Sequence, residues 1–408
     1  MTAQTWLATV TPMLQLPSSS MFALPYADPA IAPLVATGHA GLLTSAVDLS
    51  MQSLASRNLP AQPAVAPAGG SLSDSEWSAL AAGQTAFVKY SSATRQSMVS
   101  DGRTLIVASP ASLGGPGPTN QTSALNIRQR LLAEASLTIG TTRTTDLTVV
   151  LPAGWDPGSA VGIRTFFTEL TRPWLTFTGL PAISSGTATL SRTPARATLK
   201  QRANIAAALA LRARAARLTS VLATTAAVNG ALARQLAATE LSTLSYNASN
   251  APARYQSNAH RTAEYLADLL RSVRVEGTEF VTLSGSSGVI TVALHNGLNQ
   301  PIRVGLRQID KLRGNTVQVD PVAAVTLEPG ERSTLRVNLT ARRVSVQEVT
   351  LSAVNSHGVP FGTPLAFTLR SSPIGAVVWA ITIAILLLLA VLVVRRLRRR
   401  LRAKREVP

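Results

Sequence analysis

The sequence predicts a multidomain α+β protein that contains a partial, barrel-like α/β unit, a helical hairpin, an immunoglobulin-like β-sandwich and one C-terminal transmembrane helix. Three observations predict this order. Helical and extended patterns alternate in the N-terminal part. The spacing of apolar residues then changes from three or four, as in a helix, to two, as in a strand, and a run of residues without charge lies near the C-terminus. These changes place domains at 1–190, 191–276 and 277–372, a transmembrane helix at 373–395 and a basic cytoplasmic tail at 396–408.

Composition sets the broad class. Hydrophobic side chains make up 46% of the 408 residues, which is enough for packed cores. The net charge is +18, but only four of the 38 basic residues are Lys, a bias that we interpret as GC-rich coding. The 18 aromatic residues do not alternate with basic ones as on a single-strand nucleic-acid surface, so no nucleic-acid partner is expected. The lack of Cys excludes disulfides, thiolate metal sites and a Cys nucleophile.

Residues 1–190 are predicted to form an α/β layer structure. Strands are expected at Met21–Leu24, Thr85–Tyr90, Thr104–Ala108 and Leu147–Leu151, and helices at Trp6–Leu14, Pro29–Ala36, Asp74–Ala82, Ser123–Leu137 and Ala160–Leu170. Two segments rich in Pro, Gly and small residues, near 58–70 and 109–121, are predicted to be disordered loops. The unit opens on a helix and has too few strands for a closed eight-stranded barrel, so it is expected to be partial.

Residues 191–276 are predicted to form a helical hairpin. Apolar residues keep a spacing of three or four from Leu218 to Leu236, which indicates one helix. A second helix is expected from Pro252, because Pro suits a first helical turn and Asn250 lies at the capping end. Arg residues on the opposite face, Arg212 among them, are expected to face solvent, with an anionic surface contact as the alternative.

Residues 277–372 are predicted to form the sandwich. Apolar and polar residues alternate at Ile290–Leu294, Ile302–Leu306, Leu335–Leu339 and Leu365–Leu369, as expected of strands that bury one face. Turn residues separate these stretches, for example Asn296-Gly297 and Pro329-Gly330. About seven short strands predict an immunoglobulin-like fold without the Cys pair of antibody domains.

The C-terminal run predicts the location of the protein. Ile374 to Val394, with Trp379 inside it, is a stretch of 21 residues without a charged side chain. A helix of that length spans about 31 Å, which matches a hydrocarbon core of about 30 Å. Basic residues follow at once, namely Arg395, Arg396, Arg398, Arg399 and Arg400. The positive-inside rule therefore predicts a single-pass protein of the cell membrane, with its N-terminal region outside and its C-terminus cytoplasmic. Membrane lipid is its expected partner, and recruitment of a cytoplasmic partner by the Arg residues is the alternative to a purely topogenic role.

The N-terminal residues do not supply the export that this orientation requires. Met1–Ser20 has neither a basic n-region nor an apolar core, so it is not predicted to be a signal peptide. Three explanations stay open: the chain is the C-terminal part of a longer exported protein, its start is misassigned, or the span inserts as a tail anchor. We favour the first, because tail anchoring would require a basic segment to be translocated.

Tyr26 and Asp28 are the candidate catalytic residues. They lie in the segment Pro25–Pro29 at the end of a predicted strand, where α/β folds place their active sites. The favoured interpretation is structural, since Asp before Pro also suits the N-cap of a helix. A carboxylate pair for glycoside chemistry would join Asp28 to another acidic residue, and the sequence offers Asp48, Asp101 and Glu134.

No metal or cofactor is expected. The four His residues lie in separate settings without the spacing of metal ligands, and no phosphate-binding glycine motif occurs.

Several stretches together resemble a known family. The runs FVTLSGSSGVITVALHNGLNQPIRVGLR, VTLEPGERSTLRVNLTA and GTPLAFTLRSSPIGAVVWAIT, with ALPYADPAI, ALNIRQRLLAEASL and LTVVLPAGWDP upstream, are similar to large, uncharacterised, single-pass membrane-anchored envelope proteins of actinobacteria. Members typically begin with a signal peptide and a longer N-terminal region, so the resemblance implies the C-terminal part of such a protein. Their genes tend to lie beside that of the lipid II flippase, which implies a role at the cell wall. The family has no assigned reaction, so the resemblance carries over no catalytic residues.

The sequence predicts a membrane-anchored extracytoplasmic scaffold or binding protein of the cell envelope and not an enzyme, and the resemblance implies a link to peptidoglycan assembly. A cell-wall glycan or a membrane protein of wall synthesis is the expected partner. Two alternatives stay open: a glycan-processing hydrolase or deacetylase-like enzyme that uses Asp28, and a regulator of a neighbouring membrane transporter. The sequence does not identify the ligand or the oligomeric state.

Overall fold

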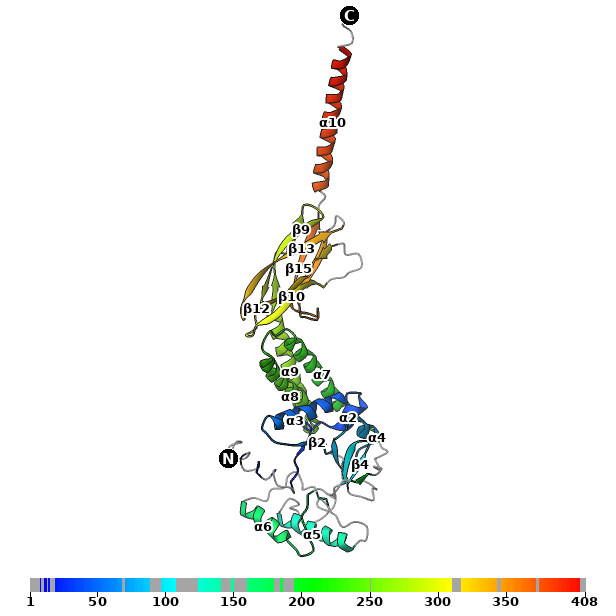
Figure 1. Ribbon diagram of the computed structural model, residues 1–408, viewed down its shortest axis with the longest axis vertical. Helices are drawn as coiled ribbons and strands as arrows, with labels where there is room; N and C mark the ends of the chain where they lie inside the picture. The colour runs from blue at the N-terminus through cyan, green and yellow to red at the C-terminus, as the bar shows by residue number, and fades with distance from the viewer. Residues whose placement is uncertain are drawn as a thin grey trace. The chain divides into compact units, whose positions relative to one another are not determined.

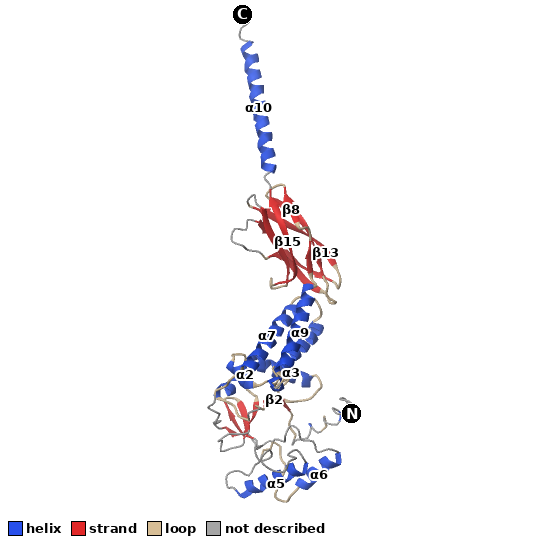
Figure 2. Cartoon of the chain, turned by 180° about the vertical axis from the view of Figure 1, so that it is seen from behind, coloured by secondary structure: helices blue, strands red, loops and turns tan. Residues whose placement is uncertain are grey.

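The chain folds into two compact units in a computed structural model that describes residues 8, 11–12, 14, 19–67, 70–88, 97–107, 124–140, 148–149, 160–179, 184–185, 194–249, 251–309, 317–342, 346–371 and 374–403 (Figure 1). The first, here called the α/β unit, comprises Met1–Arg212 and Arg234–His260. The second, the sandwich unit, comprises Ala213–Ala233 and Arg261–Pro408. Strands occur in both units (Figure 2), so the predicted mixed α+β class is confirmed.

The sheet of the α/β unit has the strand order β1-β2-β3-β5-β4-β6 within the described residues. Its strands are short: β1 (Phe22–Ala23), β2 (Gln62–Val65), β3 (Thr85–Val88), β4 (Ser97–Ser100), β5 (Arg103–Val107) and β6 (Ser184–Ser185). β1, β2, β3 and β5 pair in parallel, whereas β4 and β5 form an antiparallel hairpin. Asp101 and Gly102 both have positive φ in that hairpin, as a two-residue turn of this kind requires.

One predicted loop contains a strand. Near 58–70 the structure has β2, which pairs with β1 on one side and β3 on the other, so the prediction of a disordered loop is wrong there. The strand escapes detection because it is four residues long, begins Gln-Pro and buries both Ala64 and Val65, which leaves no alternation to read. The second predicted loop, near 109–121, lies outside the described residues, as do most of Trp6–Leu14 and Leu147–Leu151.

Five described helices accompany the sheet to form a continuous apolar core. These are α2 (Ile31–Ala36), α3 (Gly41–Ala55), α4 (Asp74–Ala79), the N-terminal part of α7 (Leu199–Thr219) and the C-terminal part of α8 (Ala226–Thr243). The buried cluster includes Leu34, Leu42, Trp77, Leu105 and Ile205. A separate small cluster joins α5 (Ala124–Gly140) to α6 (Ala160–Leu170) and consists of Ile127, Leu131, Phe166 and Leu170.

The described part of 191–276 contains three α-helices and not the predicted hairpin. α7 ends at Thr219, α8 spans Ala226–Thr243 and α9 spans Pro252–Arg271, so the expected start at Pro252 is confirmed. The apolar stripe from Leu218 to Leu236 hides a break, because Thr225 begins a new helix: its carbonyl accepts from Asn229 N at 3.0 Å and its hydroxyl from Val228 N at 3.5 Å. The boundary between the two units falls within all three helices.

Arg212 does not simply face solvent as predicted. Its Nε lies 2.9 Å from the Oε1 of the buried Glu240 on α8, and its Nη2 donates to Ser45 Oγ at 3.1 Å. Burial raises the pKa of the Glu240 carboxyl, although the charge of Arg212 and its hydrogen bond work in the opposite direction. The partly exposed Arg212 therefore joins α7 to α8 and α3 at the edge of the α/β unit's core.

The sandwich unit has nine described strands in two sheets that meet at β7. They are β7 (Arg274–Glu276), β8 (Phe280–Leu283), β9 (Ser287–His295), β10 (Ile302–Gln308), β11 (Val317–Val319), β12 (Val322–Leu327), β13 (Arg332–Ala341), β14 (Val346–Val354) and β15 (Pro360–Ser371). The alternation read from the sequence is confirmed, because Val292, Leu294, Val304, Val337 and Phe367 are all buried. The immunoglobulin-like β fold predicted for 277–372 is supported by this arrangement.

Two details fix how the chain enters the sandwich. Gly362 has φ +78°, and a Cβ there would lie 2.5 Å from the carbonyl oxygen of Val273, just after α9. Thr363 donates from its backbone N to that oxygen and from its hydroxyl to Arg271 O, both at 2.8 Å. β7 and β8, the first strands, pair in parallel with β15, the last one.

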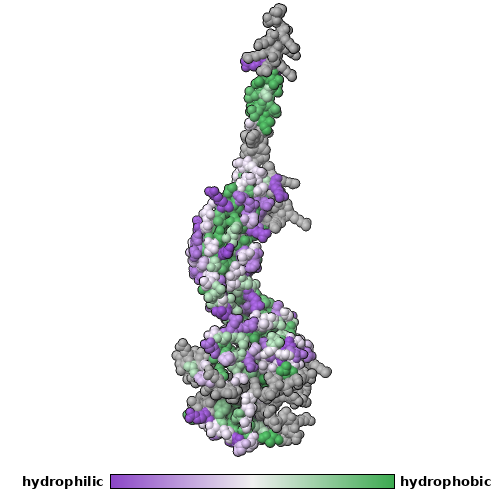
Figure 3. All heavy atoms as spheres, in the orientation of Figure 1, coloured by the Kyte–Doolittle hydropathy of each residue, from purple (hydrophilic) through white to green (hydrophobic). Residues whose placement is uncertain are grey.

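The final helix, α10, spans Ile374–Ala403. Its described side chains from 381 to 396 are exposed, and they form an apolar band that ends near Val394 and Arg395 (Figure 3). The side chains of Ile374, Trp379, Arg398, Arg399 and Arg400 lie outside the described part of the chain. Among the residues that are described, no helix combines the length and the apolar character needed to cross a membrane.

Candidate functional site

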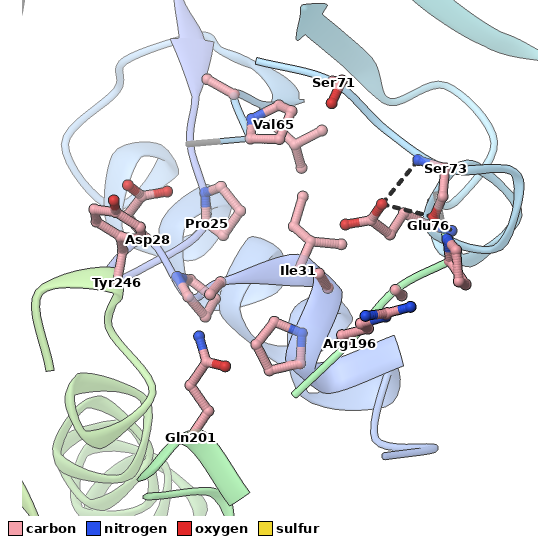
Figure 4. Close-up of a pocket in the computed structure, with 18 residues that line it drawn as sticks. Pro25, Asp28, Ile31, Val65, Ser71, Ser73, Glu76, Arg196, Gln201 and Tyr246 are labelled. Carbon is pink, nitrogen blue, oxygen red and sulfur yellow. Dashed lines mark hydrogen bonds between the residues drawn. The ribbon is translucent and has the colours of Figure 1, made fainter. Parts of the chain in front are cut away.

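A cavity of about 310 Å³ opens in the α/β unit at the carboxyl ends of two parallel strands (Figure 4). Pro25 and Asp28 follow β1, and Ala66 and Pro67 follow β2, so both strand ends contribute to its wall. Ligands of open α/β sheets bind at this edge because the loops after the strands converge there. The sequence-based expectation of a site at the end of the first strand therefore coincides with a real cavity.

Most of the cavity wall is apolar and stiff. Proline, whose ring fixes φ, occurs at five lining positions, and alanine, isoleucine and valine fill much of the rest. The apolar lining consists of Pro25, Pro29, Ala30, Ile31, Ala32, Pro33, Val65, Ala66, Pro67, Pro194 and Ala195. Its size lies at the lower end of the range for small-molecule sites, about 300–1,000 Å³.

The backbone is strained where Asp28 enters the wall. Ala27 and Asp28 have φ of 62° and 46°, although neither is Gly. A left-handed conformation costs such residues roughly 1–2 kcal/mol each. Hydrogen bonds hold it in place: Asp28 N donates to Pro25 O, Tyr26 N to Ala46 O and Tyr246 N to Asp28 O, each at 2.9 Å. Consecutive strained residues beside a cavity are typical of functional sites.

Asp28 is not the helix cap that the sequence suggested. The N-cap of α2 is Ala30 and no side chain caps it, so the favoured structural interpretation is wrong. The reason is the turn at Ala27 and Asp28, which ends two residues before the helix begins. Partial desolvation raises the pKa of the Asp28 carboxyl above its usual value, although the residue as a whole is exposed. Within the described part of the chain its carboxylate has no hydrogen-bond partner.

Glu76 is the acidic residue that sequence reasoning missed. It is only 8% exposed, and its Oε2 accepts from Ser73 N at 2.8 Å and from Ser73 Oγ at 2.6 Å. This is a capping box at the start of α4. The other oxygen, Oε1, has no hydrogen-bond partner among the described residues and is turned toward the cavity in Figure 4. The Ser-x-x-Glu spacing was the only available signal, and it predicts a helix start instead of a binding group.

Four further polar residues line the cavity, and one of them is Ser71. Arg196 is exposed and adds a positive charge near Glu76, and Tyr246 exposes 47% of its surface at the other end, beside Asp28 (Figure 4). Gln201 is engaged locally, because its Oε1 accepts from Thr198 N at 2.9 Å and from Thr198 Oγ1 at 3.0 Å at the start of α7. Donors and acceptors are thus distributed along the cavity.

The structure does not bring the predicted carboxylates together. Tyr26 is exposed and does not line the cavity, Asp48 is exposed on α3, Asp101 forms the β4–β5 turn and Glu134 lies on α5. Asp28 and Glu76 do line it, but from opposite ends, with Pro25, Ile31 and Val65 between them (Figure 4). Among the described residues, no three His, Asp or Glu side chains converge as metal ligands.

Comparison with known proteins identifies a family whose function is unknown. A family described as "Family of unknown function (DUF6049)" matches residues 74–405, a segment that includes Glu76, Arg196 and Tyr246 and begins after Asp28. No curated protein matches the chain.

Solved structures are similar to about a quarter of the chain. The PapD-like domain 7 of human CEP192 is 12% identical, with a TM-score of 0.19, over 25% of this chain and 85% of that one. WR4, a C. elegans member of the MSP family, is 10% identical with a TM-score of 0.19, over 25% of this chain and 98% of that one.

Proposed function

The chain belongs to a protein family of unknown function, DUF6049, and from this premise we propose that it is a membrane-anchored extracytoplasmic binding protein or scaffold of the bacterial cell envelope. Its α/β unit binds a component of the envelope in the cavity between Asp28 and Glu76. The finer expectations from the sequence, an actinobacterial source and a link to peptidoglycan assembly, belong to the same proposal.

The observation that carries the anchor is the C-terminal apolar run. Ile374–Val394 has no charged side chain, and the large apolar side chains described on α10, from Ile381 to Val394, are 49–63% exposed. Such a surface is costly in water and suits a hydrocarbon environment. Arg395 and Arg396 follow directly, which favours a cytoplasmic C-terminus.

The arrangement of the cavity favours binding over catalysis. Glycosidases use two carboxyl groups that flank one bond, about 5–10 Å apart. Asp28 and Glu76 instead lie at opposite ends of the cavity, and Oε2 of Glu76 is occupied by Ser73 (Figure 4).

The anchor is tested in spheroplasts that carry the full chain behind an export signal. External protease is expected to degrade the α/β and sandwich units and leave a short C-terminal fragment in the membrane. The double variant Leu387→Arg with Leu388→Arg should lose membrane retention, because charged groups at the middle of a span cost about 2.5–3.5 kcal/mol each. Arg at the exposed sandwich positions Thr334 and Thr340 is the matched control. Full protection of the N-terminal units would overturn the proposed topology.

A glycan-processing enzyme is the second candidate, and the strained Asp28 with its raised pKa favours it. Turnover of a glycan that is lost in Asp28→Asn, while folding is retained, would establish this alternative. The third hypothesis, that the protein regulates a neighbouring transporter, stays a prediction, and no described residue supports it.

A further inference from the structure

We propose that the cavity between Asp28 and Glu76 binds a short, uncharged saccharide segment, with the free carboxylate oxygens accepting hydrogen bonds from its hydroxyl or acetamido groups. The ligand class rests on the proposed role as an extracytoplasmic binding protein. The proposal is supported by the hydrogen-bond acceptors, the charges and the shape of the cavity.

The first argument comes from the unsatisfied acceptors. Glu76 is a buried residue whose Oε2 accepts hydrogen bonds from Ser73. Its Oε1 faces the cavity and has no protein donor among the described residues (Figure 4). Because the capping box fixes the side chain, Oε1 cannot turn away to another partner. Oε1 is not among the buried unpaired atoms of the described residues, so it stays open to the cavity, where a ligand that supplies O–H or N–H groups can replace water. Asp28 offers a second such acceptor at the other end.

The second argument comes from charge. The cavity has two carboxylates and one guanidinium, that of Arg196, in a chain whose net charge is +18. The carboxylates disfavour phosphorylated or acidic polymers, although the chain as a whole attracts them. A single ammonium group would need carboxylates that converge, and these lie at opposite ends (Figure 4). A polyhydroxyl ligand can donate hydrogen bonds to the carboxylates at both ends of the cavity and accept one from Arg196.

The third argument comes from shape. Pro25, Ile31 and Val65 form an apolar floor between the two polar ends, against which the C–H faces of sugar rings can pack (Figure 4). Tyr246 adds a half-exposed aromatic ring beside Asp28. The five prolines keep this wall preformed, which lowers the entropic cost of binding.

The test titrates N,N′,N″-triacetylchitotriose into the detergent-solubilised full chain by calorimetry, with trigalacturonate as an acidic probe of the same length. Binding of the neutral probe alone is expected. Glu76→Gln should weaken it about tenfold, because the amide oxygen can keep the Ser73 bonds while an NH₂ group replaces the free acceptor. Asp48→Asn, on exposed α3, is the matched control and should bind like the unchanged chain.

A second variant keeps the test decisive if Glu76→Gln fails to fold. Ala66 is exposed at the rim after β2, so Ala66→Phe fills the cavity without changing its charges and should abolish binding. Absence of chitotriose binding, preference for trigalacturonate, or equal affinity in Ala66→Phe would overturn the proposal. Membrane fractionation of the unchanged chain separates the two claims: a chain that stays in the membrane fraction but does not bind chitotriose removes only the ligand, and a chain that binds chitotriose but leaves the membrane fraction removes only the anchor.

Discussion

The sandwich unit and the α/β unit differ in how they build a hydrophobic core. In the sandwich, β9, β13, β14 and β15 have 9–12 residues and pair in long ladders. In the α/β unit no described strand exceeds five residues, and helices supply much of the core. The long ladders make the sandwich regular, whereas the short strands leave room for loops such as Ala27–Asp28. The candidate site lies in the less regular unit, where strain can be tolerated because the surrounding core holds it.

The largest expected effect tests whether each unit has its own core. Phe367 in the sandwich and Phe166 in the α5–α6 cluster are both 2% exposed. Phe367→Ala and Phe166→Ala should each cost about 3–5 kcal/mol through lost burial and a cavity. Hydrogen exchange of the full chain, resolved by peptide, should show each loss confined to its own unit. Reduced protection of β9 and β13 in Phe166→Ala would contradict two independent cores.

A smaller effect separates conformational strain from steric overlap in the sandwich unit. Gly362 and Gly330 have nearly the same φ, +78° and +74°, but a Cβ at Gly330 meets nothing within 4 Å. Gly330→Ala should therefore lower the free energy of unfolding by about 1–2 kcal/mol. Gly362→Ala adds overlap with Val273 O and should cost about 2–4 kcal/mol. Urea unfolding measures both, and equal losses would show that the chain does not enter the sandwich as tightly as described.

The smallest effect concerns pH and the α/β unit. Partial desolvation raises the folded-state pKa of Asp28 above its value in the unfolded chain. Between these two values the folded state binds more protons, so stability falls as pH rises through that window. Asp28→Asn should therefore stabilise the unit slightly at neutral pH, also because Asn tolerates positive φ, and part of this gain should vanish below about pH 3.5.

Thermal unfolding at both pH values measures this effect, with Asp48→Asn as the control for the loss of one negative charge. A gain of the same size at both pH values would assign the effect to backbone conformation alone.

The sandwich could be predicted because its information is local. Alternation at Val292–Leu294 or Phe367–Leu369 directly marks the buried face, and glycine and proline mark the turns. The break between α7 and α8 was missed for the same reason, since Leu218 and Leu236 keep a helical period across it. A spacing rule cannot distinguish one helix from two helices in phase.

The site could be predicted only in part. The end of the first strand indicated Asp28, which lines the cavity, because topology places parallel strand ends at one edge. β2 was hidden by its Pro-rich surroundings, and without β2 nothing in the sequence places Ser73 and Glu76 near Asp28. The raised pKa and the positive φ of Asp28 likewise arise from contacts that are distant in sequence.

The parallel pairing of β7 and β8 with β15 has a mechanical consequence. The chain enters the sandwich from α9 through β7 and β8 and leaves it from the far end of β15 toward α10. If lipid holds α10 while the wall holds the α/β unit, tension pulls these neighbouring strands in opposite directions along their length. The hydrogen bonds from Phe280–Thr368 to Leu283–Ser371 are then loaded in shear and must break together instead of one after another. Such a connection resists stretching along the direction of its strands.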